Sequence, residues 1–253
     1  MTGVQTCALP ICQTITSTAA GLTIRADDMT LDATINAAGR TVTLISNTGS
    51  DTIDIGSTGA SAANRLELSN AELQRIAATT LVIGSGAAGN IAFVTADVTP
   101  GSNTGANVAT VSVVTGGTIT ATAAGIIETN LALTAGDTIL FTRASTNVTN
   151  LAISAASETV TFTDVNAVDI NTVAGIAGVT ATTFNLNTGG AVSDTTASAI
   201  SGVTTIVAGS GNNVILDVAG NNFGTVAVTS GSIVTLVDRS EERRVGKECR
   251  SRW

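Results

Sequence analysis

The sequence predicts an all-β protein that folds as a right-handed parallel β-helix (β-solenoid) with one short helical cap near residues 70–76. Three observations support this fold class. Aromatic residues make up 2% of the chain and charged residues 12%, while Gly, Ala, Thr, Val and Asn dominate; such side chains fill a narrow interior better than a wide globular core. Apolar and polar residues alternate in short segments bounded by Gly, Asn and Asp, which is typical of strands. The third observation is an internal repeat.

The repeat begins at Asn130 with NLALTAGDTILFT and again at Asn150 with NLAISAASETVTFT, with one extra residue, Ala156, in the second copy. A period of about 20 residues built from strands and turns is typical of solenoids, in which each coil buries its apolar face only against its neighbours. Coils about 4.8 Å apart would stack like on like. The expected pairs are Leu131 with Leu151, Leu133 with Ile153, Ile139 with Val160, and Phe141 with Phe162.

The asparagine at the start of each repeat copy has an expected position in the coil. Asn130 and Asn150 are placed at equivalent corners, where their amides either bridge successive coils or act as ordinary turn residues. At about 20 to 25 residues per coil, residues 13–238 would form roughly nine to eleven coils. Open ends of such a stack would expose strand edges and apolar core, so we expect the terminal coils to fray or aggregate.

Short strands are expected along most of the chain. A loop, TPGSNTGAN, contains Pro100, and Thr99 before it is biased to extended geometry, so this loop is expected to protrude. The expected strands outside the repeat are Leu22–Arg25, Met29–Ile35, Thr41–Ile45, Asp51–Ile55, Asn90–Val98, Val108–Val114, Val168–Val173, Phe184–Leu186, Thr204–Val207, Val214–Val218, Thr225–Val228 and Ile233–Val237.

The stretch RLELSNAELQRIAATTLVIGS, residues 65–85, predicts a strand, a helical cap and a second strand. Ser69 and Glu72 have the S-x-x-E spacing of a capping box. Leu68 and Leu73 occupy the positions of a hydrophobic staple around the first turn. The helix is expected to last about two turns, because the residues from Ala77 onward lead back into β-branched sequence.

The two ends differ in composition from the rest of the chain. Reverse-translated, the run RSEERRVGKECRSRW resembles the adapter that is ligated to DNA fragments for short-read sequencing, and TGVQTCALPI resembles a translation of the opposite adapter. We interpret residues 1–12 and 239–253 as adapter-derived and not native, and residues 13–238 as a fragment of a β-solenoid repeat region. The alternative is a genuine basic tail that would indicate nucleic-acid or membrane binding.

Excluding the ends changes the composition. All three Cys, the Trp and the single Lys, Lys247, lie in the ends, so residues 13–238 contain no Cys, Lys, Trp, Tyr or His. Five of the 11 basic residues and 16 of the 19 acidic residues remain, which gives this part a formal net charge of −11. An acidic surface repels phosphate backbones, so nucleic-acid binding is not expected. No apolar run is long enough for a membrane span.

Three segments carry a family resemblance: LELSNAELQRIAATTLVIGSGAAGNI, TGGTITATAAGIIETNLALTAGDTI and NVTNLAISAASETVTFTDVNAVDINTVAGIAGV. They resemble the repeat region of filamentous-haemagglutinin-like large exoproteins, which are bacterial surface adhesins with a right-handed parallel β-helix. The resemblance covers about residues 38–179. It implies secretion or display at the bacterial cell surface, adhesion to a host cell, a neighbouring cell or a polysaccharide, and continuation of the same long chain at both ends. The secretion domain of such proteins is not in this sequence.

We expect no catalytic, cofactor-binding or metal-binding residues. Without His, Cys, Lys and Tyr the usual nucleophile–base pairs cannot be assembled. Two carboxylate pairs, Asp27 with Asp28 and Asp51 with Asp54, can act as paired acids or calcium ligands, or be solvated turn residues, which we favour. The segment GSGNNVILD, residues 209–217, is interpreted as a turn followed by a strand, and GSGAAG, residues 84–89, as a loop between strands.

The sequence therefore predicts a structural stalk or adhesive segment of a secreted or surface-anchored bacterial exoprotein, without catalysis. Two alternatives stay open. One is a polysaccharide-acting β-helix enzyme. The other is an ice-binding solenoid, indicated by Thr-x-Thr triplets that begin at Thr41, Thr118, Thr159 and Thr180. A regular threonine array on one face would favour ice binding, and scattered threonines would favour the stalk.

Overall fold

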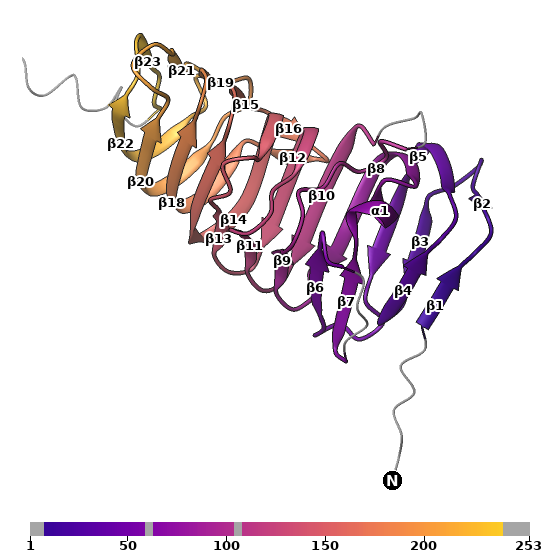
Figure 1. Cartoon of the computed structure of the whole chain (residues 1–253). Coiled ribbons are helices and arrows are strands. Elements are labelled where there is room, and N and C mark those ends of the chain that lie inside the picture. Colours follow the sequence, from indigo (N-terminus) through magenta and orange to yellow (C-terminus); the bar gives the residue numbers. More distant parts are fainter. Residues whose placement is uncertain (1–7, 59–62, 104–107, 240–253) are drawn as a thin grey trace, which may run out of the picture.

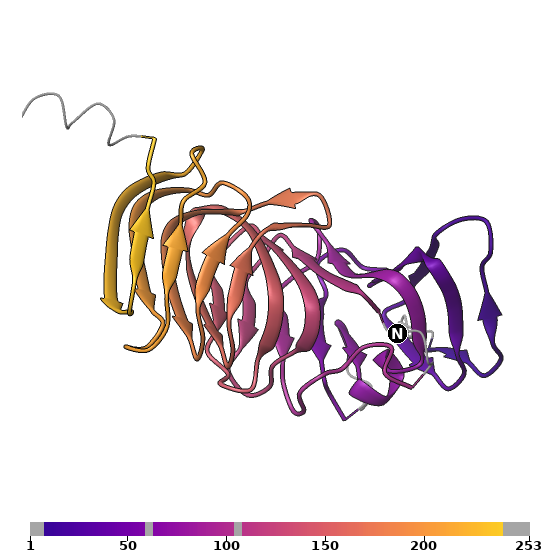
Figure 2. The same cartoon turned by 90° about the horizontal axis from the view of Figure 1, so that it is seen from above.

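The computed structural model describes residues 8–58, 63–103 and 108–239 and is a parallel β-helix. Nineteen strands belong to one continuous sheet system whose pairings are all parallel, and one four-residue helix interrupts them. Figure 1 shows the coils stacked as an elongated rod with β1 and β23 near opposite ends, and Figure 2 shows the coils following one another along the axis. The all-β, parallel β-helical fold class is confirmed.

One face of the rod is a run of parallel strands in this spatial order: β3 (Leu22–Arg25), β5 (Ile35–Ile45), β8 (Ile76–Ser85), β10 (Thr110–Thr115), β12 (Ile127–Ala135), β14 (Asn147–Asp164), β18 (Val179–Thr188), β20 (Ala199–Val207) and β22 (Asn222–Ser230). A second face runs through β7 (Arg65–Leu68), β6 (Thr52–Ile55), β9 (Ile91–Phe93), β11 (Ile119–Ala121), β13 (Ile139–Phe141) and the second half of β14. The second halves of β18, β20 and β22 continue it.

The remaining strands complete the coils and the first end. A third run consists of β15 (Val168–Ile170), β19 (Val192–Asp194), β21 (Val214–Leu216) and β23 (Val234–Leu236). Near the first end, β1 (Ala8–Ile11) pairs with β4 (Asp28–Leu31), and β2 (Ile15–Thr16) pairs with β5. The antiparallel hairpin of β16 (Thr172–Val173) and β17 (Ile176–Ala177) lies outside the main sheet.

The predicted like-on-like stack is confirmed in every pair. Leu131 pairs with Leu151 and Leu133 with Ile153, and on the second face Ile139 pairs with Val160 and Phe141 with Phe162. All eight side chains are fully buried. Since each coil contributes the same inward positions, the core is one continuous column along the rod.

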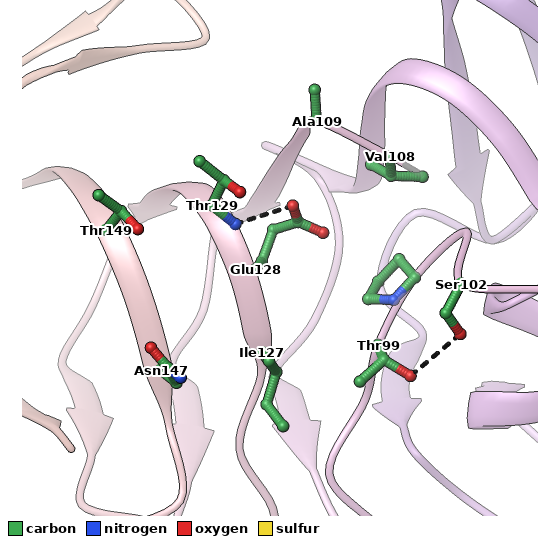
Figure 3. A pocket seen from close by; sticks show the side chains of 10 residues that line it. Thr99, Ser102, Val108, Ala109, Ile127, Glu128, Thr129, Asn147 and Thr149 are labelled. Carbon is green, nitrogen blue, oxygen red and sulfur yellow. Dashed lines mark hydrogen bonds between the residues drawn. The ribbon is translucent and has the colours of Figure 1, made fainter. Parts of the chain in front are cut away.

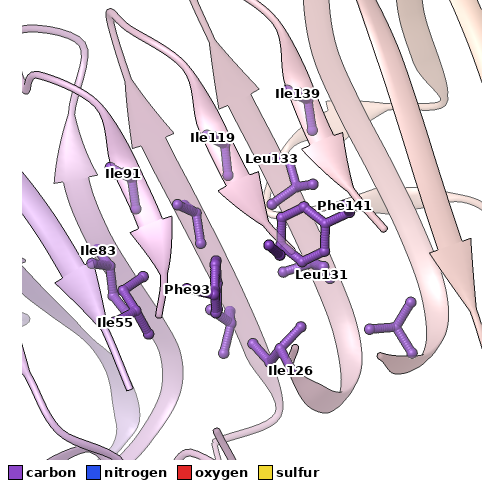
Figure 4. Close-up of a cluster of buried hydrophobic side chains, with 14 of the residues drawn as sticks. Ile55, Ile83, Ile91, Phe93, Ile119, Ile126, Leu131, Leu133, Ile139 and Phe141 are labelled. Carbon is purple, nitrogen blue, oxygen red and sulfur yellow. The ribbon is translucent and has the colours of Figure 1, made fainter. Parts of the chain in front are cut away.

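Three of the five phenylalanines, Phe93, Phe141 and Phe162, lie in one column of this core, and Figure 4 shows Phe93 and Phe141. The Phe141 ring stacks on Phe162 with centroids 5.4 Å apart and meets the edge of Phe93 at 5.1 Å. Phe93 and Phe141 are not direct strand neighbours, because Ala121 pairs with both of them. The small Ala121 side chain leaves the space in which the two rings meet, an alternation of large and small residues that fills a narrow core.

Coil length is regular in one part of the rod and irregular in another. Consecutive partners lie 20 residues apart from Val111 to Leu131 and from Leu131 to Leu151. They lie 39 residues apart from Val42 to Leu81 and 30 apart from Leu81 to Val111. The first long coil holds the extra strand β7 and the helix, and the second holds the segment after β9.

Helix α1 (Asn70–Leu73) has the predicted capping box. The Glu72 amide donates to the Ser69 hydroxyl, and the Glu72 carboxylate accepts from the Ser69 amide at 2.8 Å. The staple residues Leu68 and Leu73 are both fully buried. The helix is one turn long and ends before residue 76, because Ile76 already pairs with Ile35 in the sheet.

Several expected boundaries were wrong. Met29–Ile35 is two strands, because the chain turns at residues 32–34, where the amides of Asp32 and Ala33 both donate to the Ile11 carbonyl. The expected strand Asn90–Val98 is a strand only at Ile91–Phe93, and Val168–Val173 is divided at Asn171.

Part of the first end, which we interpret as adapter-derived, takes part in the fold. Residues Ala8–Ile11 pair with β4, and the Ile11 side chain is 7% exposed. The open edge of a β-solenoid offers free backbone groups to any extended segment, so this pairing is independent of where residues 1–12 come from. Residues 240–253 of the other end lie outside the described residues.

Candidate functional site

A cleft of about 520 Å³ lies on the side of the rod. Described residues between β9 and β10 form one wall, and the first residues of β12 and β14 form the other (Figure 3). Its volume is in the range of about 300–1,000 Å³ that is usual for small-ligand sites. The described lining residues are Thr99, Pro100, Ser102, Val108, Ala109, Ile127, Glu128, Thr129, Asn147 and Thr149.

The first wall is fixed to helix α1 by main-chain hydrogen bonds. The Gly101 amide donates to the Leu73 carbonyl at 2.9 Å, and the Asn103 amide donates to the Gln74 carbonyl at 3.1 Å. Gly101 has φ +74°, and an added Cβ would lie 2.5 Å from the Val108 nitrogen, so this position needs glycine.

Side chains add to this attachment. Thr99 donates its amide to the Asn70 side chain at 2.9 Å and accepts a hydrogen bond from the Gln74 amide group at 2.8 Å. Pro100 is buried. The expectation that this loop protrudes was therefore wrong for residues 99–103, and residues 104–107 lie outside the described part.

Glu128 is the chemically distinctive residue of the cleft. In the sheet register it pairs with Val148, which is 1% exposed, whereas its neighbour Ile127 is 43% exposed. The carboxylate thus occupies a position that is apolar in the next coil. Its Oε1 accepts a hydrogen bond from the Thr129 amide at 2.9 Å. Burial raises the pKa of Glu128 to about 7, and the Thr129 amide opposes this only in part.

No ion pair neutralises this carboxylate among the described residues. The two described ion pairs are Arg65 with Asp54 and Arg143 with Asp97. Glu128 is also the only charged side chain among the described residues that line the cleft. The cleft therefore combines one carboxyl group, several hydroxyls, an amide and an apolar surface. This set can bind a ligand, and it lacks the second carboxyl group that paired-acid hydrolysis of glycosides uses.

A polar ladder runs along the outer surface beside the cleft. Asn150 Nδ2 donates to Asn130 Oδ1 at 2.7 Å, and Asn171 Nδ2 donates to Asn150 Oδ1 at 3.2 Å. Asp169 accepts from the Ser193 hydroxyl at 2.8 Å, one coil further on. The prediction that Asn130 and Asn150 bridge successive coils is confirmed, and both lie within assigned strands, β12 and β14.

In the structure, Asp27 and Asp54 interact with residues other than their predicted partners. Asp27 hydrogen bonds to Asp51 of the next coil, and Asp54 forms an ion pair with Arg65 at 2.7 Å. Burial and the Asp27 charge raise the pKa of Asp51. Burial alone would raise the pKa of Asp27, but hydrogen bonds, first from the Thr48 amide, lower it overall. Asp51 is 4% exposed, so the solvated-turn interpretation was wrong for it.

A second, smaller cleft of about 190 Å³ lies at α1, and Asp28 lines it together with Glu67, Glu72 and Arg75. Burial raises the pKa of Glu67, whose Oε2 is buried without a hydrogen-bond partner. The described part of the chain contains no group of three or more His, Cys, Asp or Glu side chains placed to hold a metal ion.

The threonine triplets do not form a regular array. Thr120 pairs with Ala92 on one side and Leu140 on the other, and Thr161 pairs with Leu140 and Asn185. In the segment of residues 209–217, Val214 is buried in β21 after a turn, as the sequence predicted.

Sequence reasoning did not identify the cleft or Glu128. The available signal was the run IIET, residues 126–129, in which the alternation of apolar and polar residues breaks down.

The fold defines this protein as a parallel β-helix, with a lateral cleft between the loop after β9 and the first residues of β12 and β14. No protein-family model matches the chain, and no curated protein or solved structure is significantly similar to it. Within the described residues, no helix is long and apolar enough to cross a membrane.

Proposed function

We propose that this protein is a structural stalk or adhesive segment of a large secreted or surface-anchored bacterial exoprotein, and that it acts by binding without catalysis. One observation carries the proposal: an unbroken parallel strand ladder connects β3 at one end to β22 at the other. Such a rod holds its two ends apart at a fixed distance and offers a long lateral surface for contacts.

Polar side chains that are hydrogen bonded between coils support a mechanical role. Asn130, Asn150 and Asn171 are hydrogen bonded from coil to coil, and Asp194 accepts a hydrogen bond from Asn221 of the following coil. These bonds fix the register of neighbouring coils, because a slip by one residue would separate every pair in the ladder.

The partner proposed for the adhesive surface is a host or neighbouring cell surface, or a polysaccharide. The resemblance of residues 38–179 to surface exoproteins supports this class of partner. The formal net charge of −8 supports it against nucleic acid, whose phosphates an acidic rod repels.

The test is a binding and turnover assay on the full chain. Beads coated with the protein are mixed with bacterial cells, cultured host cells and a panel of immobilised polysaccharides, and heat-unfolded protein serves as the control. We expect saturable binding by the folded chain and no release of reducing ends or unsaturated sugars. Absence of binding to every surface would contradict the adhesive role.

A second candidate, a polysaccharide-acting enzyme, is favoured by one observation. The pKa of Glu128, raised to about 7 by burial, is suited to proton transfer at neutral pH. This candidate requires turnover of a polysaccharide by the folded chain, and it requires that Glu128→Gln abolish that turnover while the exposed-surface variant Asp137→Asn keeps it.

A further inference from the structure

The cleft presents an acid that no cation among the described residues neutralises. Glu128 is half-buried and lines the cleft together with the apolar side chains of Ile127, Val108 and Pro100, and its one described hydrogen bond uses a single carboxylate oxygen, Oε1. Figure 3 shows the side chain among the groups that line the cleft. A desolvated carboxylate without a counter-charge is destabilised, so a cation that reaches it is bound more strongly than at an exposed acid.

We propose that the cleft binds a protonated amino sugar, with the ligand's ammonium group beside Glu128 and its hydroxyl groups against the hydroxyls and amide of the walls. This goes beyond the proposed stalk function and does not depend on it, because the site is defined by the cleft alone.

The charge of the cleft argues for the ammonium group. Glu128 is the only charged side chain among its described lining residues, so an ammonium group meets no competing cation in that lining. The chain as a whole carries a formal net charge of −8, which raises the local concentration of cationic ligands.

The polar lining argues for a sugar rather than a simple amine. Thr99 and Ser102 stand on one wall, and Thr129, Asn147 and Thr149 on the other. Hydroxyl and amide groups both donate and accept, which suits ligand hydroxyls. The apolar side chains of Ile127 and Pro100 offer a surface for the C–H face of a sugar ring.

The experiment is calorimetric titration of the full chain with glucosamine. Two matched ligands separate the parts of the proposal: glucose has the hydroxyls without the charge, and propylammonium has the charge without the hydroxyls. We expect glucosamine to bind more tightly than either. N-acetylglucosamine, which is neutral, is expected to behave like glucose.

Glu128→Gln is the test variant, because it removes the charge and keeps the shape. It is expected to weaken glucosamine binding by about tenfold or more and to leave glucose binding unchanged. Glu158→Gln removes the same charge from β14 outside the described cleft lining and is expected to keep wild-type affinity. Circular dichroism of both variants checks that the fold is retained.

The pH dependence gives a second readout on the unmodified chain. Only the ionised carboxylate attracts the ammonium, and the free carboxyl has a pKa of about 7. Affinity for glucosamine should therefore rise about 50-fold between pH 5 and pH 7 as the competent fraction grows. In a carboxyl NMR titration, bound glucosamine should lower the pKa of Glu128.

Three results would overturn the proposal. The first is no saturable binding of glucosamine to the wild-type chain. The second is that the wild-type chain binds glucosamine and glucose with equal affinity, or that the wild type and a folded Glu128→Gln variant bind glucosamine with equal affinity. The third is an affinity of the wild-type chain for glucosamine that does not change between pH 5 and pH 7. This test remains valid even if the Glu128→Gln variant fails to fold.

Discussion

The clearest stability prediction concerns the variant Phe141→Ala, in the column formed by Phe93, Phe141 and Phe162. Phe141 is fully buried, and its ring lies between Phe93 at 5.1 Å and Phe162 at 5.4 Å. Removal of the ring leaves a cavity that the neighbours cannot close, because each neighbouring strand is held by ladder hydrogen bonds on both sides.

The expected cost follows from the buried ring and its two contacts. Truncation of a core Phe to Ala costs about 3–5 kcal/mol. Two aromatic pairs of about 0.5–1.5 kcal/mol each place Phe141 in the upper half of that range, at ~4–5 kcal/mol of unfolding free energy. Phe223→Ala in β22 is the matched control. Phe223 is 4% exposed and has no described ring partner, so its loss should cost about 3 kcal/mol.

Urea unfolding followed by circular dichroism measures both variants, and amide exchange locates the change. We expect protection to fall most in β11, β13 and β14 for Phe141→Ala and only in the last coils for Phe223→Ala, because repeat proteins unfold through local nearest-neighbour contacts. A cost for Phe141→Ala no larger than that for Phe223→Ala would refute the stacked-column reasoning.

Three further predictions concern polar groups. Asn150→Ala should cost about 1–2 kcal/mol and reduce amide protection around Asn130, since it breaks two inter-coil hydrogen bonds; an unchanged urea midpoint would argue against the ladder. Glu72→Ala should cost about 2–4 kcal/mol and expose the Leu31 amide to exchange, because the carboxylate accepts from both Leu31 and Ser69, whereas Glu72→Gln should lose less. The folded-state pKa of Glu128 is raised from 4.5 to about 7, so its contribution to stability is present at low pH and is lost as pH rises through 7. Glu128→Gln should therefore match the wild type near pH 4 and be more stable by roughly 1–2 kcal/mol at pH 8, after allowance for solvent screening; equal stability at both pH values would contradict the raised pKa.

The regular part of the rod was predictable because it is encoded locally and repeated. The two copies that begin at Asn130 and Asn150 align with one inserted residue, Ala156, so the stacked pairs follow from an offset of 20 residues before the insertion and 21 after it. The capping box of Ser69 and Glu72 is equally local, since both partners lie within one turn. Both features depend on short spacing that the sequence displays directly.

The irregular coils were not predictable, because they depend on which distant strands become neighbours. The Asp27–Asp51 contact joins two coils, and no local spacing indicates it. The hairpin of β16 and β17 was missed for the same reason. It places Val173 over the outward-facing Ala132 and Ala152, which are fully buried. Alanine at outward positions of two successive strands was the available signal that another segment covers them.

The cleft lies where the long coils meet the regular coils. The 520 Å³ cleft is lined on one side by residues of the loop after β9 and on the other by the first residues of β12 and β14. Further along the rod, the strands β18, β20 and β22 contribute no described residue to the cleft lining. A change in these later coils should therefore alter unfolding without altering the site.

A double-mutant cycle tests this separation. Phe223 in β22 and Glu128 in β12 are separated by the successive pairings β12–β14, β14–β18, β18–β20 and β20–β22. If coupling in the rod is limited to neighbouring coils, the stability effects of Phe223→Ala and Glu128→Gln should add within about 0.5 kcal/mol. Phe223→Ala should also leave glucosamine affinity unchanged. A larger coupling energy would mean that the rod transmits strain over several coils, and the cleft could then not be treated as a local site.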